Sequence, residues 1–112
     1  MIILNIFFTL FYLIFNKYYS IENFGINESI KLFYILSKFG LLNSDYKFLI
    51  INGKLECDEL VHDIRILQYK SNLIDAEILS DYDKRKLSKI KDKFQMYNYN
   101  LDTLFHYFNS HR

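Results

Sequence analysis

The residues best suited to binding a charged ligand lie in one short segment, positions 84 to 93. Six of these ten residues are Lys or Arg, and Asp92 is the only acid among them. Such a density of cations is typical of a surface that contacts phosphates, either in RNA or in anionic lipid headgroups. It is also typical of the solvated face of an amphipathic helix. The candidate phosphate or headgroup contacts are Lys84, Arg85, Lys86, Lys89 and Lys93, and Lys91 is the sixth cation.

Residues that could perform catalysis or bind a metal are few and isolated. The lone cysteine, Cys57, is expected to pack as a small hydrophobic side chain. His62 has no second His or Cys three or four positions away, as a helical metal site would need. The acids between Glu56 and Asp63 lack the pattern of a calcium loop, so we interpret them as charges at the start of a helix. Without a phosphate loop or a recognisable catalytic motif, we expect a non-catalytic protein with no cofactor and no metal.

The most apolar part of the chain is its beginning. Eleven of the fourteen residues from Ile2 to Phe15 are Ile, Leu or Phe. As a helix this stretch would be about 21 Å long, shorter than the roughly 30 Å hydrocarbon core of a bilayer. Extension to Tyr19, with aromatic side chains at the headgroup level, makes a membrane span feasible.

Three interpretations of this beginning remain open. Residues 1–19 form a membrane anchor, a helix buried in a protein core, or, least favoured, a cleaved signal peptide, because no Lys or Arg precedes the apolar run. The side chains expected to contact lipid or a partner are Ile2, Ile3, Leu4, Ile6, Phe7, Phe8, Leu10, Phe11, Leu13, Ile14 and Phe15. Residues 20–112 are expected to form a single small helical domain.

Apolar spacing predicts a mainly α-helical protein with five or six helices, counting the one at the beginning. Helices are expected from about 28 to 39, 59 to 70, 81 to 96 and from 101 onward, with a short one over 73–79. Polar residues at the helix starts predict N-caps at Asn27, Asp58, Ser80 and Asn100. A glycine at position 40 predicts a left-handed end to the second helix.

A β-hairpin is predicted over about residues 46–57. Asn52-Gly53 supports the positive φ angles of a two-residue type I′ turn. This turn pairs Ile51 with Lys54 and Ile50 with Leu55. Alternation then places one apolar face of the hairpin against the helices, because a hairpin alone is marginally stable in water. That face consists of Phe48, Ile50, Leu55 and Cys57.

Composition indicates the genome and the kind of partner. Phe, Tyr, Met, Ile, Asn and Lys, which have mostly A/T-rich codons, make up 59 of the 112 residues. The composition therefore resembles that of small subunits encoded by AT-rich organelle genomes, although no motif carries this likeness. The net charge of +1 makes the chain as a whole a poor polyanion binder.

Aromatic side chains are more numerous than so small a domain can easily enclose, with 21 Phe and Tyr. Exposed aromatic and aliphatic surface usually marks a partner interface. We therefore expect a small accessory subunit of a large assembly, whose partners are other protein subunits and, with the anchor, membrane lipid. It would be membrane-associated, in a mitochondrion or other organelle, or cytoplasmic if the first helix is buried. The alternative is an RNA-contacting component of a ribonucleoprotein, which would use the basic segment 84–93.

Overall fold

The computed structural model describes residues 2–15, 25–68 and 79–110. Within them the chain forms five α-helices and one antiparallel two-stranded sheet, which confirms the prediction of a mainly helical fold with a hairpin. The short helix predicted over 73–79 lies outside the described residues except for Leu79, as does the predicted helix end near residue 70. The elements in order are α1 (Ile2–Phe15), α2 (Ile26–Lys38), β1 (Leu49–Ile51), β2 (Lys54–Glu56), α3 (Asp58–Gln68), α4 (Asp81–Met96) and α5 (Leu101–Ser110).

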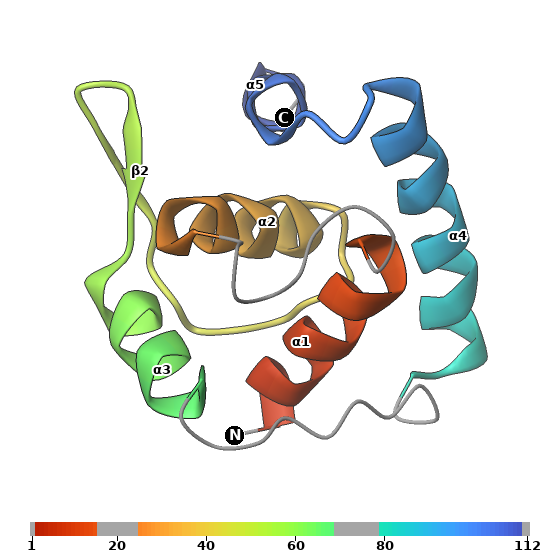
Figure 1. Ribbon diagram of the computed structural model, residues 1–112, viewed down its shortest axis with the longest axis horizontal. Coiled ribbons are helices and arrows are strands. Elements are labelled where there is room, and N and C mark those ends of the chain that lie inside the picture. Colours follow the sequence, from red (N-terminus) through yellow and green to blue (C-terminus); the bar gives the residue numbers. More distant parts are fainter. Residues whose placement is uncertain (1, 16–24, 69–78, 111–112) are drawn as a thin grey trace.

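Helix α2 lies at the centre of the molecule, with α3 and the hairpin on one side and α4 on the other (Figure 1). It packs against α5, β2 and α3. A helix that is apolar around most of its circumference must be covered on several sides, and α2 follows this rule. Between Ser29 and Leu36 only Lys31 is not fully buried, which confirms the prediction for this helix.

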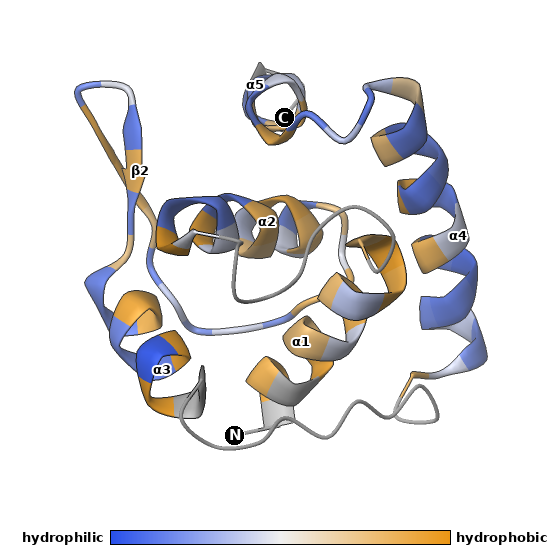
Figure 2. Ribbon diagram, in the orientation of Figure 1, coloured by the Kyte–Doolittle hydropathy of each residue, from blue (hydrophilic) through white to orange (hydrophobic). Residues whose placement is uncertain are grey.

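Helix α1 is part of the same core. It packs along α4, and its strongly hydrophobic ribbon contrasts with the mostly hydrophilic ribbon of α4 (Figure 2). The ring centroids of Phe7 and Phe33 are 5.2 Å apart, as are those of Phe15 and Phe94. Of the interpretations left open by the sequence, the structure shows the buried helix for residues 2–15. No helix in the described ranges combines the length and the apolar character needed to cross a bilayer.

The end of α2 has the structure predicted for it. Gly40 adopts φ +89°, the left-handed conformation that glycine tolerates best. Its N–H donates to the carbonyl of Ser37 at 3.1 Å, and the N–H of Leu41 donates to the carbonyl of Leu36 at 2.9 Å. These two bonds form a Schellman motif and turn the chain towards the loop that precedes β1.

Two of the predicted N-caps are confirmed. The hydroxyl oxygen of Ser80 accepts a hydrogen bond from the N–H of Asp83, 3.1 Å away, at the start of α4. The side-chain oxygen of Asn100 accepts from the N–H of Thr103, 3.0 Å away, at the start of α5. Each cap satisfies a backbone donor that has no partner within its own helix.

The other two predicted N-caps are wrong by one or two residues. Helix α2 begins at Ile26, because the carbonyl of Gly25 accepts both the N–H and the hydroxyl of Ser29, each 3.0 Å away. Asn27 is therefore inside the first turn. Helix α3 begins at Asp58 itself, because the carbonyl of Cys57 accepts the N–H of the fourth helical residue at 3.1 Å.

The hairpin has the predicted turn and register but not the predicted packing. Asn52 and Gly53 have φ +52° and +79°, and Ile50 pairs with Leu55. Leu55 is buried where β2 packs on α2, whereas Ile50 is 44% exposed, so its assignment to the packed face is wrong. The physical reason is that the hairpin extends away from the helices, which cover its base and not its tip (Figure 1).

Candidate interaction site

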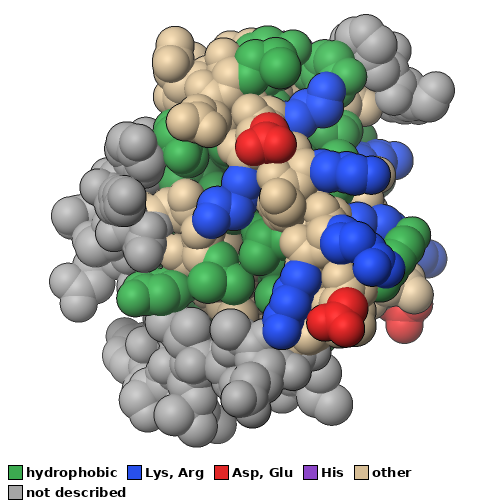
Figure 3. Space-filling model, turned by 90° about the vertical axis from the view of Figure 1, so that its right-hand side faces the viewer, with side chains coloured by type: hydrophobic (Ala, Val, Ile, Leu, Met, Phe, Trp, Pro, Cys, Tyr) green, Lys and Arg blue, Asp and Glu red, His purple; other side chains and the backbone are tan. Residues whose placement is uncertain are grey.

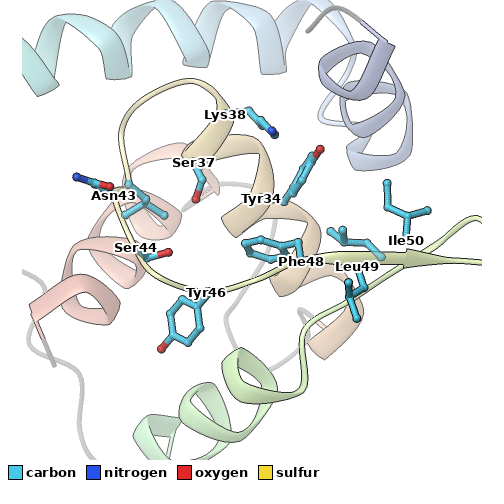
Figure 4. A pocket seen from close by; sticks show the side chains of 11 residues that line it. Tyr34, Ser37, Lys38, Asn43, Ser44, Tyr46, Phe48, Leu49 and Ile50 are labelled. Carbon is cyan, nitrogen blue, oxygen red and sulfur yellow. The ribbon is translucent and has the colours of Figure 1, made fainter.

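A cavity of about 610 Å³ lies between the second half of α2, the loop that follows it and strand β1 (Figure 4). Seven of its eleven lining residues are aromatic or aliphatic, and the other four are polar or charged. This volume falls within the range of protein ligand pockets, roughly 300–1,000 Å³. The described residues that line it are Tyr34, Ser37, Lys38, Leu42, Asn43, Ser44, Tyr46, Phe48, Leu49, Ile50 and Leu55.

Aromatic contacts hold the loop before β1 against α2. The ring of Phe48 meets that of Tyr34 edge-on, with centroids 5.4 Å apart and planes at 78°. The ring of Tyr46 meets that of Phe33 at the same centroid distance and 87°. Edge-to-face pairs of this kind stabilise a structure by about 0.5–1.5 kcal/mol beyond their burial. The wall of the cavity is therefore fixed by the same side chains that complete the core.

The hydroxyl of Tyr46 does not serve the cavity. It donates a hydrogen bond to a carboxylate oxygen of Asp63 on α3, 2.5 Å away. Burial, together with this bond, raises the pKa of Tyr46 above the ordinary value of 10. This phenol is protonated at neutral pH and bonds to a carboxylate, so it ties the loop to α3. It is not placed to transfer a proton in the cavity.

One charged side chain lines the cavity in the part of the chain that the structure describes. The ammonium of Lys38 lies 5.3 Å from the ring centroid of Tyr34, and Lys38 itself is exposed. The nearby hydroxyl of Ser37 donates to the carbonyl of Phe33 at 2.8 Å and so is already satisfied. The cavity thus combines aromatic and aliphatic side chains with polar ones and with a single positive charge at its α2 end (Figure 4).

Strand β1 continues the apolar wall of the cavity onto the surface. Leu49, Ile50 and Ile51 are 60%, 44% and 48% exposed, although all three are large apolar residues. In the described sheet β1 pairs with β2 alone, so its other edge is available to a further strand. We call the cavity and strand β1 together the hairpin groove.

The predicted basic segment forms a separate surface on α4. Viewed from the side of α4, Lys and Arg side chains gather along this helix (Figure 3). Of the predicted contacts Lys84, Arg85 and Lys89 are exposed, and so is Lys91. Acids also lie on this helix, at positions 81, 83 and 92. The helix therefore brings four outward cations together on one side of the molecule.

The other two cations of α4 make contacts within the protein. The ammonium of Lys86 lies 4.5 Å from the ring centroid of Tyr82 and 3.4 Å from the carbonyl oxygen of Gly40. The ammonium of Lys93 lies 3.3 Å from the hydroxyl of Tyr107 and 4.8 Å from its ring centroid. Both side chains are half-buried, so they are less suited to contacting an external phosphate than their neighbours.

The side chains of α1 that were predicted to contact lipid or a partner lie mainly in the protein's own core. Their contact with lipid or with another protein stays a prediction, because the structure contains neither. The side chain of Ile2 is outside the description. Seven are buried, namely Leu4, Phe7, Phe8, Leu10, Phe11, Ile14 and Phe15, and three are half-buried, namely Ile3, Ile6 and Leu13.

The remaining polar residues form no centre of their own among the described residues. No group of three or more His, Cys, Asp or Glu side chains in this part of the chain is placed to hold a metal ion. Cys57 is buried with a free thiol, as predicted. His62 is exposed.

Sequence reasoning missed the cavity but contained a signal for the exposed strand. Three consecutive apolar residues, Leu49–Ile51, cannot all face one side of a strand. Some of them must therefore point away from the core, whatever the register. The cavity had no such signal, because it depends on where the loop after α2 lies.

Comparison with known proteins gives no family for this chain. No protein-family model, no curated protein and no solved structure matches it. The features of the described structure that bear on function are the hairpin groove and the charges of α4.

Proposed function

We propose that this protein is a small non-catalytic subunit that binds another protein of a larger assembly through the hairpin groove. The observation that carries the proposal is strand β1, whose three adjacent apolar side chains are 44–60% exposed beside a cavity that has both apolar and polar lining residues. Contiguous apolar surface next to a concave wall is typical of a protein docking site. An unpaired strand edge adds backbone donors and acceptors to that surface.

A polypeptide suits this site better than a small molecule. Small-molecule sites usually contain several polar groups that converge on the ligand. Here the hydroxyl of Tyr46 bonds to Asp63 outside the cavity, and the hydroxyl of Ser37 bonds to its own helix. The other polar residues of the described lining are Lys38, Asn43 and Ser44. An extended chain could instead occupy the cavity and continue along β1, where the apolar surface is exposed.

The cellular location is proposed on composition alone. The AT-biased residue usage supports an organelle such as the mitochondrion, as for the small subunits that the composition resembles. The expected membrane anchor was residues 1–19, which include α1. The described side chains of α1 lie mostly in the core, so membrane attachment is not part of the proposal.

Site-specific photo-crosslinking tests the proposal. A photoreactive phenylalanine at position 49 or 51, introduced into the protein in its source cells, should crosslink to one discrete protein. The matched control is position 66 on α3, because Ile66 is also apolar and 43% exposed but lies away from the groove. Equal crosslinking from positions 49 and 66, or none from 49 and 51, would overturn the proposal.

A second candidate function is contact with RNA through α4. The exposed cations Lys84, Arg85, Lys89 and Lys91 on one side of the molecule favour it (Figure 3). Two further cations, Lys86 and Lys93, are held by tyrosines, and three acids share the helix, so the field is weaker than the sequence suggests. The test is whether binding to RNA exists and weakens steeply as salt rises.

A further inference from the structure

We propose that the partner enters the hairpin groove as an extended segment, which adds a strand to the outer edge of β1 and places an acidic side chain beside Lys38. This inference rests on the proposed protein-binding function and names the kind of chain that is bound. Three observations carry it: the orientation of the β1 backbone, the size of the available surface, and the charge of the cavity.

The backbone of β1 is oriented to accept another strand. In a two-residue hairpin the pair beside the turn, here Ile51 and Lys54, is the hydrogen-bonded pair. Antiparallel pairing alternates, so the next pair, Ile50 with Leu55, directs its backbone groups away from the partner strand. The N–H and C=O of Ile50 therefore face the outer edge, where an incoming strand would bond to them.

The size of the surface favours a segment over a second copy of this chain. Strand β1 is three residues long, so two copies joined edge to edge would share only a short ladder. A stable interface buries about 800 Å² on each partner, well beyond what three residues can supply. An extended segment gains further contact area, because side chains on one of its faces can fill the cavity of about 610 Å³ beside β1.

The charge of the cavity selects the segment. Lys38 is the one charged side chain among the described residues of the lining, and no acid accompanies it there. The segment from Asp45 to Glu56, which contains the hairpin, has no net charge, because its two Lys are matched in number by its two acids. The exposed apolar side chains of β1 and the single ammonium thus fit a strand with alternating apolar residues and one Asp or Glu.

Peptide display on the full chain tests the inference with a defined probe. A random library of displayed peptides, selected on the intact protein, should yield sequences with alternating apolar residues and an Asp or Glu. Lys38→Glu should weaken the selected peptides about fivefold, as expected for an exposed ion pair. Selection on this variant should favour Lys or Arg instead. Lys91→Glu on α4 is the matched control and should change neither result.

Hydrogen exchange tests the added strand without any substitution. The amide of Ile50 should exchange at least several-fold more slowly when a selected peptide is bound, while the amide of Ile66 on α3 should not change. Selected peptides that show no acidic preference, or that leave the exchange of Ile50 unaltered, would overturn this inference. The protein-binding role would still stand in that case. It is decided separately by the crosslinks from positions 49 and 51.

Discussion

The phenol of Tyr46 and the carboxylate of Asp63, 2.5 Å apart, join the loop before β1 to helix α3. This bond crosses 17 positions of sequence and fixes one wall of the cavity. Tyr46→Phe removes the donor and leaves a half-buried carboxylate without it. We expect a loss of about 1–2 kcal/mol in the free energy of unfolding, measured by urea denaturation, whereas Tyr12→Phe on α1 should have little effect.

The same bond predicts how stability changes at alkaline pH. Because the pKa of Tyr46 is raised in the folded protein, the phenol keeps its proton after the unfolded chain has lost it above pH 10. The bond's contribution is therefore complete below pH 10 and is lost as pH rises towards the folded pKa. Above pH 10 the free energy of unfolding should therefore fall more steeply with pH for the wild type than for Tyr46→Phe. The two slopes should differ by up to about 1.4 kcal/mol per pH unit. Parallel pH profiles would contradict this assignment.

The burial of α1 predicts unequal effects of two substitutions on one helix. Phe7 is 1% exposed and Tyr12 is 45% exposed. Phe7→Ala should destabilise the protein by about 3–5 kcal/mol through loss of burial and a residual cavity, a large share of the stability of such a domain. Tyr12→Ala should cost far less. If α1 left the core for another environment, thermal unfolding of the two variants would be equally affected.

An ion pair between α2 and α5 predicts a small effect at acid pH. The ammonium of Lys31 bonds to the carboxylate of Asp102 and holds the pKa of that carboxyl below its usual range. The ion pair's contribution to stability is therefore present above the pKa of Asp in the unfolded chain, near 4. It is lost as the pH falls through the lower pKa of Asp102 in the folded protein. Since Asp102 is largely exposed, Asp102→Asn should cost less than about 1 kcal/mol at neutral pH. The difference from wild type should shrink with salt and vanish near pH 2.

The cations of α4 predict two different phenotypes. Gln at positions 84, 85 and 89 should abolish most of the RNA binding that the second candidate function predicts. The slope of the logarithm of affinity against the logarithm of salt concentration should fall by about one unit for each phosphate that is no longer neutralised. The change should scarcely alter thermal stability, because these side chains are exposed.

Gln at positions 86 and 93 serves as the comparison. It removes cations that lie over tyrosine rings, so it should lower stability by about 0.5–1 kcal/mol for each site and leave any RNA affinity nearly unchanged. The second candidate function fails if the wild-type protein shows no salt-dependent binding to RNA.

Local signals in the sequence predicted most of the fold. The caps at Ser80 and Asn100, the left-handed end at Gly40 and the turn at Asn52-Gly53 each depend on a few adjacent residues. Apolar spacing likewise predicted the helix that became α4, whose buried residues are Leu87, Ile90 and Phe94. Such features form in the same way whatever surrounds them.

Long-range packing decided what could not be predicted. The sequence of α1 suits a bilayer and a core equally, and the choice depends on contacts such as Phe15 with Phe94, far away in the chain. The exposure of Ile50 depends on where the helices end and not on the alternation of the strand. The cavity depends on the loop after α2, whose position is fixed by Tyr46 and α3.

The central place of α2 has a consequence for the newly made chain on the ribosome. Its contacts with α5, such as Lys31 with Asp102 and Tyr34 with Asn109, join residues 71 and 75 positions apart. The last described helix must therefore emerge before the core can close. Until then the side of α2 that packs on α5, where Tyr34 meets Phe105, has no cover. Synthesis rate and chaperone supply would thus decide the yield of this protein as much as its final stability does.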